Sequence, residues 1–247
     1  CRQREMCRLC RDSITLLNDT WWVLPLVTSI VLASFGAYST WMAFSNVDFL
    51  VQPYLSPFYS PYILASWWPF SPALLILWAP LGFRATCYYY RKAYYRSFFM
   101  APPGCAVKPM AKAGNYDGET KFPFIIQNIH RYFFYAAAVV LFFLWVDAFH
   151  ALWFEDGFGI GVGTIVLFVY VILLSMYSLS CHSLRHLIGG RLDVFSKCPT
   201  RFRLWEKVSG WNENHAMWAW LSLFSVALAD LYIFLLAKGV ITDLRII

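Results

Sequence analysis

Three stretches of this chain contain no Asp, Glu, Lys or Arg, and their lengths restrict what it can fold into. They lie between Asp19 and Asp48, between Asp48 and Arg84, and between Asp156 and Arg185. Each contains an apolar run of roughly the 20 residues that a helix needs to cross a bilayer. Only 14% of the 247 residues are charged, against roughly 25% in an average soluble domain. The sequence therefore predicts an all-α integral membrane protein and excludes a soluble enzyme, a disordered chain and a disulfide-stapled secreted domain.

We predict a bundle of five transmembrane helices, which makes this a multi-pass protein. Their approximate bounds are residues 20–42, 67–88, 124–150, 157–181 and 214–237. Residues 1–19 form an N-terminal segment, residues 20–238 the membrane domain and residues 239–247 a C-terminal tail. The second helix is expected to begin only after the proline-rich residues 52–61, because each proline removes a backbone donor and opposes a continuous helix.

The distribution of positive charge predicts the orientation of the bundle. Residues 1–20, 84–131 and 182–213 hold 18 of the 20 Lys and Arg residues. The loops predicted on the opposite side, residues 43–70 and 147–157, hold none. Since cytoplasmic loops carry an excess of Lys and Arg, the N-terminus is predicted to be cytoplasmic and the C-terminus outside. This segregation also explains the net charge of +6 without a nucleic-acid partner.

Metal-binding side chains gather at one predicted depth, near the cytoplasmic surface, because alternate helices run in opposite directions. They are Cys87, His130, Cys181, His182, His186 and His215, with Cys105 and Cys198 in the adjacent cytoplasmic loops. His182 and His186 are four residues apart, so they share a helical face and could chelate a metal. The plainer explanation is that a cationic His near a helix C-terminus stabilises the helix dipole.

Three kinds of metal site remain open from these residues, since His and Cys together suit zinc, iron or copper. The first is zinc, and the second is a b-type haem held by two His from facing helices. A pair of stacked haems is excluded, because only His150 lies at the outer end. The third is a Rieske-type [2Fe–2S] cluster, in which two His replace two Cys on one iron. Its usual short motifs are absent, so such a cluster would have to be assembled across helices.

Acidic residues inside or near the membrane form a second group of candidates. Asp230 lies within the outer half of the last helix, at a depth similar to that of Asp147 and His150. Ionisable side chains at such positions often mark proton or ligand pathways. We consider an outer quinone or proton site at these three residues, and a simple interface pair as the alternative.

Several motifs give the chain a family resemblance. They are SPFYSP (residues 56–61), PLGFRATCYYYRKAYYR (80–96), PPGCAV (102–107), GETKFP (118–123), QNIHRYFFY (127–135) and CHSLRHLIGG (181–190). Together they resemble the membrane-anchor subunit of succinate dehydrogenase, of the single-chain, five-helix actinobacterial type found in mycobacteria. The resemblance implies a bacterial inner-membrane protein. An iron–sulfur subunit and an FAD-containing flavoprotein subunit would bind to its cytoplasmic face. The resemblance also implies bound lipids, and higher oligomers remain an option.

The resemblance further implies that electrons from succinate pass through the iron–sulfur subunit to menaquinone or another quinone. The chain itself would carry out no succinate chemistry. Anchors of this type are associated with an embedded Rieske-type cluster, whereas others carry haem b; a metal-free anchor is the remaining alternative. Matching the motifs residue by residue predicts two Cys ligands from Cys87, Cys105 and Cys181, and two His ligands from His130, His182 and His186.

The remaining candidates are assigned by depth. Cys198 and His215 lie outside the matching motifs and are predicted not to be ligands. A quinone at the cytoplasmic edge needs hydrogen-bond donors for its carbonyl oxygens beside an apolar slot for its tail. The residues at that depth that we expect to supply them are Tyr89, Arg131, Tyr132 and Trp205.

Overall fold

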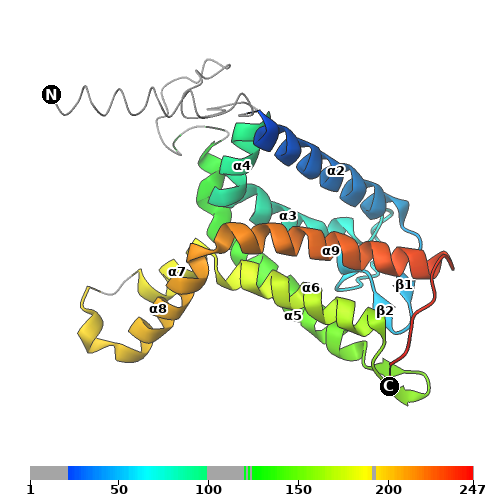
Figure 1. Ribbon diagram of the computed structural model, residues 1–247. Coiled ribbons are helices and arrows are strands. Elements are labelled where there is room, and N and C mark those ends of the chain that lie inside the picture. The colour runs from blue at the N-terminus through cyan, green and yellow to red at the C-terminus, as the bar shows by residue number, and fades with distance from the viewer. Residues whose placement is uncertain (1–21, 99–119, 121, 123, 191–192, 247) are drawn as a thin grey trace.

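The structure is a computed structural model that describes residues 22–98, 120, 122, 124–190 and 193–246. Five helices form its bundle (Figure 1): α2 (Val23–Ser45), α3 (Leu74–Thr86), α5 (His130–His150), α6 (Val162–Leu179) and α9 (His215–Ala237). The other helical elements are α4 (Tyr88–Phe98), α7 (His182–Gly189), α8 (Pro199–Glu213) and the 3-10 turns η1 (Pro57–Tyr59), η2 (Phe124–Ile129) and η3 (Phe195–Lys197). Two antiparallel hairpins pair β1 (Leu50–Val51) with β2 (Tyr54–Leu55), and β3 (Trp153–Phe154) with β4 (Gly157–Phe158).

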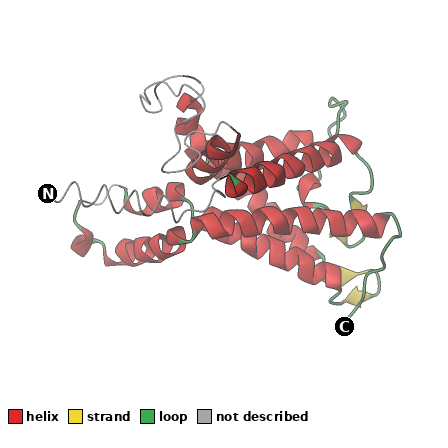
Figure 2. Cartoon of the chain, turned by 45° about the horizontal axis from the view of Figure 1, so that its top comes forward, coloured by secondary structure: helices red, strands yellow, loops and turns green. Residues whose placement is uncertain are grey.

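The bundle has two distinct ends. Helix α6 packs against α5 and α9, α3 packs against α5, and α2 packs against α4. Helices α4, α7 and α8 lie at one end, which we call the α7 end (Figure 1). Both hairpins lie at the opposite end, the hairpin end (Figure 2). The end of α3 and the starts of α5 and α9 therefore meet at the α7 end.

Four helices in the described residues are long and apolar enough to cross a membrane: Val23–Ser45, Ile125–His150, Val162–Leu179 and His215–Ala237. They correspond to the first, third, fourth and fifth predicted helices. The second is shorter than predicted, because α3 has only 13 residues. At 1.5 Å per residue it is about 20 Å long, against a hydrocarbon core of about 30 Å. The count of five spans and the orientation stay predictions.

Proline explains why α3 begins at Leu74 instead of near residue 67. Pro69 and Pro72 have no backbone N–H to donate, so neither fits a helix interior. At the other end the backbone of Cys87 is extended, and it separates α3 from α4. The same kind of break follows α6, where the extended backbone of Cys181 separates α6 from α7.

Apolar side chains cover the outside of the bundle as well as its interior. Leu24, Leu81 and Phe142 are 75%, 68% and 63% exposed, as expected for side chains that contact lipid. Inside, one core lies toward the hairpin end and includes Leu144, Leu167 and Tyr170. The second core, which we call the α7-end core, consists of Phe83, Cys87, Tyr90, Phe134, Ala137, Tyr177, Cys181 and Ala219. Both buried cysteines of the described chain belong to it.

The C-terminal tail closes the hairpin end. The Asp243 carboxylate accepts hydrogen bonds from the Tyr54 hydroxyl at 2.6 Å, the Tyr232 hydroxyl at 2.6 Å and the Gly163 amide at 2.9 Å. Gly163 is in the first turn of α6, where a carboxylate is favoured by the helix dipole. Burial and the hydrogen bond to Asp243 raise the pKa of Tyr54 to about 12, so this hydroxyl remains a donor. Glycine is required at position 163, because a Cβ atom there would lie only 2.6 Å from the Tyr54 ring.

Candidate metal centre

A cavity of about 1170 Å³ opens at the α7 end of the bundle. Two cysteines and four histidines line it, and four of these six side chains form two close pairs: Cys87 with His215, and Cys181 with His130. Cys87 follows α3 and Cys181 precedes α7, while the two paired histidines are the first residues of α5 and α9. Both thiols are buried, with 2% and 1% of the residue exposed. Elements distant in sequence thus bring two thiols and two imidazoles to one site.

The first pair at this site is Cys87 with His215. The Cys87 Sγ lies 3.4 Å from the His215 Nε2. The other ring nitrogen, Nδ1, lies 2.7 Å from the Ser180 hydroxyl. That hydroxyl donates its single hydrogen to the Tyr177 carbonyl at 3.1 Å, so it accepts from Nδ1–H. The neutral imidazole then presents the lone pair of Nε2 to Cys87.

The second pair, Cys181 with His130, repeats this arrangement. The Cys181 Sγ lies 3.1 Å from the His130 Nε2, and Nδ1 lies 2.8 Å from the Thr86 hydroxyl. Thr86 donates its hydrogen to the Gly82 carbonyl at 2.6 Å, so it also accepts from an Nδ1–H. The Phe83 ring stacks on His130 with centroids 5.0 Å apart. In both pairs a hydroxyl fixes the tautomer, as outer partners do for metal-ligating histidines.

The four side chains suit a binuclear centre better than a single ion. No three of the His, Cys, Asp and Glu side chains in the described chain gather closely enough to hold one metal ion. Together the two pairs offer two sulfurs and two imidazole nitrogens. A Rieske-type [2Fe–2S] cluster takes four protein ligands, two Cys on one iron and two His on the other. The donor set therefore fits such a cluster.

His182 and His186 differ from the other two histidines. Both line the cavity, but both are exposed, and their rings lie 6.5 Å apart. His186 Nδ1 is 2.5 Å from the Arg131 guanidinium. Their spacing of four residues puts them on one face of α7, as predicted.

The structure describes only one of the two cysteines that were expected in cytoplasmic loops. Cys105 lies outside the described residues, so its predicted role as a ligand stays a prediction. Cys198 is half-buried at the N-terminus of α8 and is not among the residues that line the cavity.

The comparisons with known proteins identify the family. A family model described as the actinobacterial succinate dehydrogenase subunit SdhC matches residues 23–239. The chain belongs to this family. The resemblance inferred from the sequence motifs is thereby confirmed, and the protein is a membrane subunit of succinate dehydrogenase.

A solved structure supports the same assignment for this SdhC-family chain. The structure described as the Mycobacterium smegmatis Sdh1 complex in the apo form contains a chain that is 45% identical. The match covers 94% of each chain with a TM-score of 0.86. No curated protein matches the sequence.

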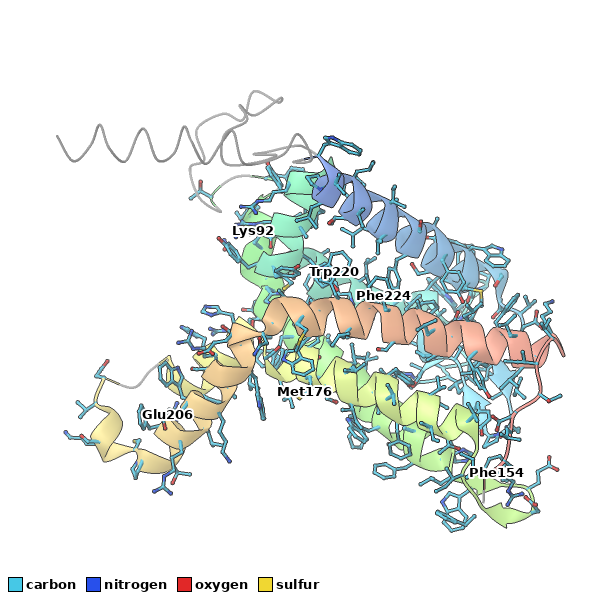
Figure 3. The ribbon with its side chains drawn as sticks, in the orientation of Figure 1. Lys92, Phe154, Met176, Glu206, Trp220 and Phe224 are labelled. Carbon is cyan, nitrogen blue, oxygen red and sulfur yellow. The ribbon has the colours of Figure 1, made fainter. Side chains whose placement is uncertain are left out.

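Three of the four predicted quinone-binding residues lie beside the metal-site candidates. Tyr89, Arg131 and Tyr132 line the same cavity. The Tyr89 hydroxyl accepts a hydrogen bond from Trp220 Nε1 at 2.7 Å. Figure 3 shows Trp220 near the start of α9. Trp205 is on α8, where the Arg185 guanidinium lies 4.9 Å from its ring centroid, and it is not part of the cavity lining.

The predicted outer residues lie at the hairpin end. Asp230 is fully buried; it accepts a hydrogen bond from the Tyr38 hydroxyl at 2.5 Å and another from Ser56. Asp147 is half-buried and accepts a hydrogen bond from Ser60. His150 is exposed at the end of α5. Asp230 therefore joins α9 to α2 and to the loop before η1.

Two residues of the α7 end gain importance only from the structure. His215 was predicted not to be a ligand, yet its Nε2 faces the Cys87 thiol. The signal in the sequence was its depth at the start of the last helix, where it shares the level of the other histidines. Arg84 contacts the α7-end core: its guanidinium lies 4.7 Å from the Tyr177 ring centroid.

Proposed function

We propose that this chain anchors the iron–sulfur and flavoprotein subunits of a succinate dehydrogenase to the bacterial inner membrane and passes their electrons to a quinone. The α7 end would face the cytoplasm and carry these subunits. Three features support this: the family match over residues 23–239, the similar chain from the Mycobacterium smegmatis Sdh1 complex, and the segregation of 18 of the 20 Lys and Arg residues in the predicted topology.

We propose that electrons pass through a Rieske-type [2Fe–2S] cluster held by Cys87, Cys181, His130 and His215. The observation that carries this proposal is the presence, on one cavity, of two Cys–His pairs with buried thiols and half-buried imidazoles, at Sγ–Nε2 distances of 3.4 and 3.1 Å. When bound, such a cluster supplies one-electron transfer at a potential higher than that of an all-Cys cluster. This revises the predicted ligand set by placing His215 where His182 or His186 was expected.

The protein groups around the pairs would orient the ligands and exclude water. Ser180 and Thr86 hold the Nδ1–H of His215 and His130, which keeps both Nε2 atoms available as ligands. The Tyr177 ring stacks on His215 with centroids 5.1 Å apart, and Phe83 covers His130. Apolar cover of this kind lowers solvent access, which helps to set the potential of a bound cluster.

The iron content of the intact complex tests the proposal. We expect the other two subunits to co-purify with this chain from detergent-solubilised membranes. Relative to those subunits released in soluble form, the complex should contain about two further irons and two acid-labile sulfides per flavin, as a [2Fe–2S] cluster requires. Equal iron and sulfide in the two preparations would contradict an embedded cluster, and extra iron without sulfide would favour haem b.

We further propose that menaquinone or another quinone binds with its head group beside Arg131, Tyr132 and Tyr89. The position of these three residues supports the proposal, because all three line the cavity that holds both Cys–His pairs. Tyr132 is 70% exposed, so its hydroxyl can reach a ligand without any change in the core. Tyr132→Phe should raise the KM for quinone several-fold and leave succinate oxidation by a soluble dye unchanged. An unchanged KM would remove Tyr132 from the site.

A further inference from the structure

The Tyr177 hydroxyl is buried without a hydrogen-bond partner among the described residues. Tyr177 is on α6, near its end at Leu179, and is fully buried. An unpaired buried hydroxyl is unfavourable, so such groups in folded proteins call for an explanation. Figure 3 shows its neighbour Met176 on the part of α6 that approaches the α7 end.

Tyr177 touches both members of the first Cys–His pair. Its ring stacks on His215 at an interplanar angle of 19°, with centroids 5.1 Å apart. Its hydroxyl is close enough to Cys87 to interact with the thiol, although the two atoms do not meet the geometry of a hydrogen bond. A neutral thiol is a weak acceptor, whereas a sulfur that carries negative charge accepts a hydrogen bond more strongly.

A cationic side chain, that of Arg84, contacts the Tyr177 ring. The Arg84 guanidinium is 4.7 Å from the Tyr177 ring centroid. It donates to the Tyr90 hydroxyl at 2.5 Å, to the Ser222 hydroxyl at 3.0 Å and to the Ala219 carbonyl at 3.3 Å. No carboxylate of the described chain forms an ion pair with it. Its charge is therefore held among neutral groups, and it adds positive potential to the α7-end core.

We infer that Tyr177 and Arg84 are redox-tuning residues that raise the reduction potential of the metal centre. This inference rests on the proposed cluster. One electron from the iron–sulfur subunit would add one negative charge to a bound cluster. The Tyr177 hydroxyl would stabilise that charge by donating a hydrogen bond to the Cys87 sulfur, and the Arg84 cation would stabilise it through its positive charge. Tyr177 keeps its proton and no covalent bond changes. Hydrogen bonds to sulfur and local charge are established determinants of cluster potential.

The chain offers a matched control in Tyr170. It lies two turns earlier on α6, is fully buried, and also has a hydroxyl without a partner among the described residues. It belongs to the core at the hairpin end and not to the α7-end core. Replacing either tyrosine by Phe removes one buried hydroxyl, and only the change at position 177 removes a donor beside Cys87.

Potentiometric titration of the purified complex, followed by low-temperature electron paramagnetic resonance, tests the inference. Tyr177→Phe should keep the cluster signal and make reduction about tenfold less favourable, a downward shift of about 59 mV for one electron. Arg84→Gln should also lower the potential, whereas Arg84→Lys and Tyr170→Phe should leave it near the wild-type value. If the Arg84→Gln complex fails to assemble, the potential measured for Tyr177→Phe still tests the inference.

The outcomes separate this inference from the proposed function. A cluster signal that is present in Tyr177→Phe at the wild-type potential, or at a higher one, overturns the inference and leaves the proposed function standing. Equal shifts in Tyr177→Phe and Tyr170→Phe overturn it too, since the effect would then be general. The absence of any such signal in the wild-type complex overturns the proposed function and the inference together.

Discussion

Replacing His215 by alanine is expected to abolish the signal of the embedded cluster, whereas His186→Ala should retain it. The two histidines line the same cavity but differ in what they face. His215 Nε2 lies 3.4 Å from the Cys87 thiol, and its Nδ1 is held by Ser180. His186 is exposed and contacts Arg131. Alanine at position 215 would remove one of the four ligands, so we expect the occupancy of the embedded cluster to fall by more than tenfold.

The measurement is the electron paramagnetic resonance spectrum of each reduced complex, with flavin content as the internal standard for assembly. His182→Ala provides a second control, because this histidine is also exposed. Loss of the signal in His186→Ala together with its retention in His215→Ala would show that the ligand set is wrong. It would restore the set predicted from the motifs.

Asp230→Leu is expected to cause a large loss of stability. The carboxylate is fully buried and accepts hydrogen bonds from Tyr38 and Ser56. Leucine cannot accept them, so two hydroxyl groups would lose their partner, at a cost of about 1–3 kcal/mol each. The thermal midpoint of the detergent-solubilised complex should fall by several degrees. Asp156→Leu is the control. The Asp156 side chain is 68% exposed and forms a surface ion pair with Arg245, and removing such a pair changes stability little.

Asp230→Asn separates this structural role from the proposed outer quinone or proton site. Tyr38 and Ser56 donate to different carboxylate oxygens. Asparagine keeps an acceptor for one of these hydroxyls and offers its NH2 group as a donor to the other, so the thermal midpoint should fall less than in Asp230→Leu. Asparagine cannot take up or release a proton, so quinone reduction should slow if Asp230 serves that site. A wild-type rate of quinone reduction in this variant would limit Asp230 to joining α2, α9 and the loop before η1.

Much of the membrane architecture could be predicted from charge alone. Two of the three charge-free stretches, and the apolar runs that begin near residues 124 and 214, correspond to helices that are long enough to span the bilayer. The prediction was less accurate for the second helix, where Pro69 and Pro72 delay the start of α3 to Leu74. Apolar composition does not distinguish a spanning helix from an apolar loop of similar length, whereas backbone hydrogen bonding does.

The candidate site was harder to predict because it depends on how helix ends pack. Depth placed Cys87, His130 and Cys181 at one level, but it could not determine which histidine would face which thiol. The spacing of His182 and His186 indicated a chelating pair. The extended backbone at Cys181 starts a separate helix, α7, and leaves both side chains exposed. His215 reaches Cys87 because α9 begins beside the end of α3, a tertiary contact that no local motif records.

The central claim is that two Cys–His pairs hold a [2Fe–2S] cluster, and pulsed electron paramagnetic resonance on the reduced, intact complex tests it most directly. The account predicts a rhombic signal with the low average g value of a His-ligated cluster, coupled to two imidazole nitrogens. Both couplings should vanish along with the signal in a Cys87→Ser, Cys181→Ser double variant. A low-spin haem spectrum in the oxidised complex, or a reduced complex without any nitrogen-coupled iron–sulfur signal, would contradict the account.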